Sequence, residues 1–142
     1  MRLFLETDDG SPCFEPPGGG HALVSFMSFA VSRGFGAQHP LIALADRLHE
    51  SLGVRLGPLT TFYEAGPEDA EDRAKLDLAW QEPGPVAASL RGLAAALASD
   101  GACATLVRRA GAEGLGGDAE ALLGPLDRAA AAGVRIRLSY AL

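Results

Sequence analysis

Three histidines are the residues of this sequence best suited to acid–base or metal chemistry. His21 follows three consecutive glycines, His39 ends a loop that begins at Arg33, and His49 falls in a segment with helical periodicity. A metal centre needs two or more such ligands that converge with carboxylates or thiolates. The sequence has neither a His-Glu-x-x-His nor a Cys-x-x-Cys motif, so a half-buried or surface histidine with a local hydrogen bond is the simpler interpretation of each.

The loops around His21 and around residues 33–39 nevertheless form a candidate ligand site. Loops held between rigid elements often carry binding residues. If the two loops approach each other, His21, Arg33 and His39 would form a small-ligand or metal-binding site. A further alternative is a small enzyme in which His39 or His49 acts as a general base. No motif assigns a catalytic residue or a metal ligand, and we expect no cofactor.

Arginines recur in the segments whose alternating pattern predicts strands. Arg135 and Arg137 share one face of the last segment, and Arg2 begins the first. On adjacent strands these guanidinium groups would gather on a polar sheet face, where they could bind a partner's carboxylate or phosphate in a bidentate manner. The alternative is that Glu6 or Asp77 stands opposite and forms cross-strand ion pairs. The sequence therefore offers Arg2, Arg135 and Arg137 as a candidate interaction face.

The glycine-rich segments do not match known phosphate-binding motifs. Residues 18–20 lack the Gly-Lys-Ser/Thr ending of a P-loop, and residues 114–117 lack the spacing of a dinucleotide fingerprint. The serines at 25, 28 and 32 are not in a Gly-x-Ser-x-Gly sequence, which excludes the usual hydrolase elbow. We interpret both glycine segments as connections.

Length and composition indicate one globular domain over residues 1–142. The chain is 48% hydrophobic and 21% charged, with a net charge of −6, which disfavours nucleic acid and anionic membranes as partners. No export signal or apolar run of bilayer length is visible, so we expect a cytoplasmic, bacterial-type protein. Cys13 and Cys103 stand in unlike contexts and are predicted to be free thiols.

Helical spacing is clearest in two segments. Apolar residues at three- and four-residue steps predict a helix over 85–99, and the same spacing predicts one from Pro40 to Leu52. Asp118 suits the start of a third helix, which Gly133 would end. Strict alternation predicts strands over 1–7 and 134–140, the latter with Ile136 and Leu138 facing the helices.

Other segments allow two interpretations. We predict strands over 22–31, 75–81 and 102–108, although the first also has helical spacing at Leu23, Phe26, Met27 and Ala30. The acidic segment after Pro67 has the signature of a helix start, so a helix over 67–80 is the alternative to the second strand. Trp80, Phe62 and Tyr63 are predicted to be core residues rather than the walls of a cleft.

These elements predict an α/β or α+β fold, a two-layer sandwich with a mixed sheet of about four to five strands. Helices would lie mainly on one face, because the strands alternate instead of being apolar throughout. The absence of catalytic motifs and the expected open sheet favour a non-enzymatic protein-interaction or accessory domain. It would act through a sheet face or an edge strand, on a protein partner or by self-association as a homo-oligomer.

Overall fold

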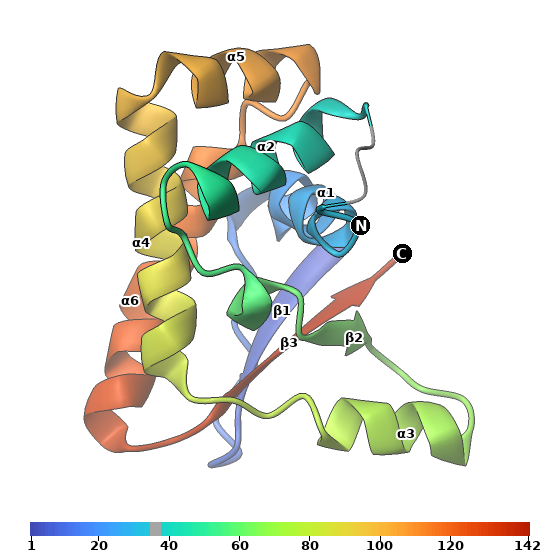
Figure 1. Ribbon diagram of the computed structural model, residues 1–142. Coiled ribbons are helices and arrows are strands. Elements are labelled where there is room, and N and C mark those ends of the chain that lie inside the picture. Colours follow the sequence, from blue (N-terminus) through green and yellow to red (C-terminus); the bar gives the residue numbers. More distant parts are fainter. Residues whose placement is uncertain (35–37) are drawn as a thin grey trace.

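The computed structural model describes residues 1–34 and 38–142, and Figure 1 shows their arrangement. These residues form six helices and a three-stranded mixed sheet, which confirms a mixed α+β fold but makes the predicted four to five strands wrong. The elements in order are β1 (Arg2–Thr7), η1 (Pro17–Gly20), α1 (His21–Ala30), α2 (Pro40–Glu50), η2 (Gly57–Leu59), β2 (Phe62–Glu64), α3 (Ala70–Asp77), α4 (Pro83–Ser99), α5 (Gly101–Arg109), α6 (Leu115–Ala132) and β3 (Ile136–Ala141).

The segment 22–31, predicted as a strand, forms helix α1. The residues with helical spacing are all fully buried: Leu23, Phe26, Met27 and Ala30. The helical spacing, and not the alternation, therefore describes this segment. The N-terminus of α1 is capped from a distant helix, because Leu23 N–H donates to Asp118 Oδ2 at 3.1 Å. Asp118 was predicted to begin its own helix, but α6 starts at Leu115 and Asp118 holds α1 in place.

The predicted strands at 75–81 and 102–108 are also wrong. Asp69 accepts a hydrogen bond from Asp72 N–H and starts α3, so the alternative, a helix over 67–80, is confirmed in kind but with the shorter bounds 70–77. Asp100 ends α4 and, by accepting from Cys103 N–H, starts α5 at once. In α5 the buried residues Cys103 and Val107 are four positions apart. This spacing places them on one face of a helix, and because it is an even number it would also place them on one face of a strand.

The sheet has the order β1-β3-β2, with β3 antiparallel to β1 and parallel to β2. The last strand is therefore central, between β1 and β2. The outer edge of β1 is partly covered, because Leu5 exchanges two backbone hydrogen bonds with Phe14, of 2.8 and 2.9 Å. Among the described residues, β2 has no strand neighbour on its outer edge.

One face of the sheet packs on the helices. Leu3, Leu5, Ile136 and Leu138 join a buried cluster with apolar residues of all the helices except α3. The opposite face carries Arg137 and Ser139, and α3 lies on this side, apart from the other helices in Figure 1. Since α3 has no buried residue, it is held mainly by its polar contacts and its short connections.

Within residues 1–34 and 38–142, no single helix has the length and apolarity that crossing a membrane requires. Together α4 and α5 have that length and composition, but they bend by 95° at their junction.

Candidate functional site

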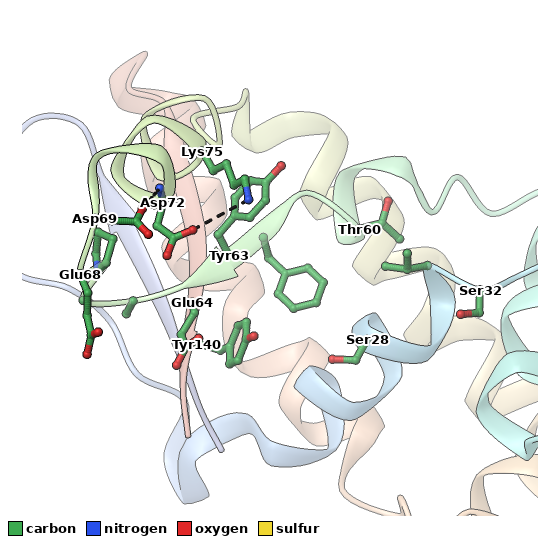
Figure 2. A pocket seen from close by; sticks show the side chains of 15 residues that line it. Ser28, Ser32, Thr60, Tyr63, Glu64, Glu68, Asp69, Asp72, Lys75 and Tyr140 are labelled. Atoms are coloured by element: carbon green, nitrogen blue, oxygen red, sulfur yellow. Dashed lines mark hydrogen bonds and ion pairs between the residues drawn. The ribbon is translucent and has the colours of Figure 1, made fainter.

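A cleft of about 940 Å³ lies where the C-terminal end of α1, strand β2 and the start of α3 meet. Figure 2 shows β2 running between two groups of side chains. Residues that are far apart in the sequence line this cleft: Ser28, Val31, Ser32, Thr60, Phe62, Tyr63, Glu64, Ala65, Gly66, Pro67, Glu68, Asp69, Asp72, Lys75 and Tyr140. Two other hollows in the described residues have smaller volumes, of about 380 and 420 Å³.

The pleat of β2 divides the cleft into two walls. Phe62 pairs in register with Leu138, so its ring faces the helix-covered side, where it lies against Tyr140 with ring centres 5.6 Å apart. Tyr63 pairs with Ser139 and faces the opposite side, toward α3. Glu64 pairs with Tyr140 and so lies on the same side as Phe62. We call the side with Ser28, Val31, Ser32, Phe62, Glu64 and Tyr140 the α1 wall, and the side with Tyr63, Glu68, Asp69, Asp72 and Lys75 the α3 wall.

The cleft is acidic. Its lining includes four carboxylates, from Glu64, Glu68, Asp69 and Asp72, against the single ammonium group of Lys75. Lys75 lies 3.8 Å from Asp72 and 3.7 Å from Glu71, so it is shared between two acids of its own helix. Neither Glu64 nor Glu68 takes part in an ion pair within the described chain. The cleft therefore has an excess of negative charge that the described residues do not neutralise.

The backbone of β2 is exposed beside this cleft. Ala65 N–H donates to Tyr140 O at 2.7 Å, which continues the ladder with β3 by one residue. Successive residues of a strand direct their N–H and C=O groups to opposite edges, so the N–H and C=O of Glu64 point to the outer edge. An exposed strand edge is a template on which another chain can add a strand.

The structure separates the predicted ligand residues. His21 is the first residue of α1 and Arg33 lies just beyond its end, so about 15 Å of helix stands between them. Arg33 donates to Ala30 O at 3.1 Å, and residues 35–37 of its loop lie outside the described residues. The two loops therefore do not bring His21 together with Arg33.

His39 has a structural role. Its Nδ1 accepts a hydrogen bond from Leu41 N–H at 3.1 Å and caps α2, while its ring stacks on Phe29 with centres 3.8 Å apart. These contacts occupy one ring nitrogen and one ring face, which leaves His39 poorly placed for the general-base alternative. His49 is exposed on α2 beside Asp46 and Glu50. No group of three potential metal ligands is found among the described residues.

The predicted arginine face is paired within the molecule. Arg137 makes two hydrogen bonds to the Glu6 carboxylate, of 2.8 and 3.3 Å, and a third to Leu76 O. Its guanidinium also lies 4.2 Å from the centre of the Trp80 ring.

The other two arginines of that face are paired as well. Arg135 contacts Asp8 at 3.1 Å, and Arg2 makes two bonds of 2.7 Å to Glu15. Internal ion pairing, which was the alternative interpretation, therefore describes all three arginines, and an external carboxylate would have to displace an existing partner.

Two aromatic residues depart from their predicted core role. Tyr63 is 38% exposed, and Trp80 lies outside the buried cluster, with its ring centre 4.2 Å from the Arg137 guanidinium. Phe62 is half-buried and packs against the core as predicted, although it also lines the cleft. Sequence reasoning also missed Glu64, Glu68 and Asp72 as site residues. The acidic run that includes the last two was visible, but its pattern indicated only a helix start.

The two cysteines are free thiols, as predicted. Cys13 is exposed and Cys103 is buried, and burial raises the pKa of the Cys103 thiol to about 11. A protonated, enclosed thiol is a weak nucleophile, so Cys103 is a core residue rather than a reactive one.

No protein-family model, curated protein or solved structure matches this chain.

Proposed function

We propose that this chain is a protein-binding module that accepts an extended segment of a partner along the outer edge of β2. The observation that carries this proposal is the open edge of β2 beside the cleft of about 940 Å³, while the other sheet edge is partly covered by Phe14. In strand addition, backbone hydrogen bonds provide affinity and the alternating side chains of the added strand provide specificity.

The geometry supports a short contact. Because β2 has three residues, an added strand would form only a few ladder hydrogen bonds with it. Most of the binding energy must then come from the two walls, on which Tyr63 and the exposed Val31 offer apolar surface. An interface of this size belongs among the small, reversible ones.

A second copy of the chain is a less suitable occupant than a different protein. Two identical edges brought together in a symmetric dimer would place both acidic clefts against each other. Like charges at close range oppose such a pairing. The charge of the cleft therefore favours a different partner over homo-oligomerisation through this edge.

A matched pair of variants at one position tests the proposal. Glu64→Pro removes the N–H that points to the outer edge, whereas Glu64→Gln keeps it and removes the charge. Peptides selected from a random displayed library against the wild-type protein provide the probe, and fluorescence anisotropy measures their binding. We expect Glu64→Pro to abolish binding while Glu64→Gln retains it, with circular dichroism confirming that both variants fold.

Two results would overturn the proposal. One is that the library yields no peptide above background. The other is that the selected peptides bind Glu64→Pro as well as they bind the wild-type protein, which would place the binding surface elsewhere.

A further inference from the structure

We infer that the partner segment carries Lys or Arg at alternate positions, which face α3, and small or apolar residues at the intervening positions, which face α1. This inference rests on the proposed strand addition and specifies the chemistry of the added strand. Its basis is that the α3 wall has three carboxylates where the α1 wall has one, and that the pleat of β2 assigns one side-chain set to each wall.

The alternation follows from strand geometry. A strand added beside β2 continues the same pleated sheet, so its successive side chains point to opposite faces. Side chains on the face of Tyr63 would meet the α3 wall, and those on the face of Phe62 would meet the α1 wall. A period of two in the partner sequence is therefore required, and a block of basic residues would not satisfy it.

The charges of the α3 wall favour a cationic side chain. Glu68, Asp69 and Asp72 belong to this wall, and Lys75, the only cation among the lining residues, is shared with Glu71 and Asp72. Helix formation alone accounts for Asp69, which caps α3, and for Asp72, which lies in the first turn. Glu68 precedes the cap, and its carboxylate is in no ion pair among the described residues, while the Arg73 guanidinium donates to its backbone oxygen at 3.4 Å.

The α1 wall is less acidic, with Glu64 as its one carboxylate. Ser28 donates its hydroxyl to Val24 O within α1, and Val31 is exposed just beyond the helix end. Phe62 and Tyr140 add half-buried rings to this wall. Small and apolar side chains fit the part of the wall formed by Ser28, Val31 and Phe62, because a charged side chain would lose water there without gaining an ion pair.

The test uses four labelled peptides that share Gly-Ser flanks. One alternates Lys with Val, one alternates Glu with Val, one alternates Ser with Val, and one has the Lys and Val residues in two blocks. Fluorescence anisotropy against the wild-type protein measures their affinities, and the Glu64→Pro variant reports whether each bound peptide uses the β2 edge. We expect the alternating Lys peptide to bind about tenfold more tightly than the Ser or the blocked peptide, and the Glu peptide not to bind.

A second pair of variants isolates the charge. Glu68→Lys should weaken binding of the alternating Lys peptide about fivefold, because it places like charges together on the α3 wall. Glu120→Lys makes the same change of net charge at an exposed position on α6 and should change binding less than about twofold.

The failures of the two proposals are distinguishable. If the Ser and Lys peptides bind equally and both lose binding in Glu64→Pro, strand addition stands and the basic specificity is wrong. The same conclusion follows if the blocked peptide binds as well as the alternating one. If no peptide depends on the Glu64 N–H, the proposed function itself fails.

Discussion

Arg137→Met is the change that best tests how the open face of the sheet is held together. The Arg137 side chain is 13% exposed and makes two hydrogen bonds to Glu6 and one to Leu76 O, beneath the ring of Trp80. Methionine keeps much of the aliphatic bulk and removes the charge, so the variant isolates the polar contacts.

The expected loss follows from these contacts. Hydrogen bonds to charged groups contribute about 1.5–3 kcal/mol, and a guanidinium over an aromatic ring adds about 0.5–2 kcal/mol. Loss of one partner from a fully buried pair costs about 3–5 kcal/mol, but the side chain of Glu6 is 31% exposed and can regain water. We therefore expect Arg137→Met to lower the free energy of unfolding by about 2–4 kcal/mol.

Urea denaturation measures this loss, followed both by circular dichroism and by the fluorescence of Trp80, the only tryptophan. Arg135→Met is the matched control, because Arg135 is 55% exposed in its pair with Asp8 and should cost less than about 1 kcal/mol. A double-mutant cycle with Glu6→Gln should give a coupling of about 1 kcal/mol or more. Equal, small losses in the free energy of unfolding of the two methionine variants would contradict the internal pairing of Arg137. They would favour the earlier interpretation, in which the arginines are free to bind a partner.

Three further predictions concern the body of the fold. Leu93→Ala should cost about 2–5 kcal/mol in urea denaturation, since Leu93 is fully buried in α4; a loss below about 1 kcal/mol would contradict this packing. Asp100→Asn should destabilise the chain at neutral pH, because the hydrogen bond from Arg47 lowers the pKa of Asp100 below its ordinary 3.8. That contribution is present above the unfolded pKa and is lost as pH falls toward the folded one, so the melting temperatures of variant and wild type should begin to converge below about pH 4 and meet only near the folded pKa. Ellman's reagent should titrate one thiol in the native chain, Cys13, and both only in urea, whereas reaction of Cys103 in the native state would contradict its burial.

The elements predicted most reliably from the sequence are those whose apolar pattern fits either a helix or a strand, but not both. The alternation over 134–140 and the four-residue steps over 85–99 correspond to β3 and α4. The three false strands are short segments in which apolar residues four apart, such as Cys103 and Val107, fit both a strand's alternation and a helical step. The capping residue then distinguishes the two structures, as Asp100 does for α5 by accepting from Cys103 N–H.

The candidate site was less predictable because it depends on tertiary neighbours. The acidic run after Pro67 was visible, yet nothing local indicates that α3 stands beside β2. An edge strand was expected from the sequence, but its identity depends on the strand order, in which β3 pairs on both sides and β2 has the open edge. Alternation alone places Arg137 on an open sheet face, where charge reversal would be harmless. In the structure Arg137 stands opposite Glu6 and is bonded to it, so charge reversal would break this ion pair.

Amide hydrogen exchange at β2 tests the proposed strand addition most directly. Ala65 N–H is already bonded to β3, and by alternation so is the N–H of Tyr63, whereas the N–H of Glu64 points outward. On addition of the alternating Lys peptide, exchange at Glu64 should slow by about tenfold or more while exchange at Tyr63 and Ala65 changes little. A bound peptide that leaves exchange at Glu64 unchanged would contradict strand addition at this edge.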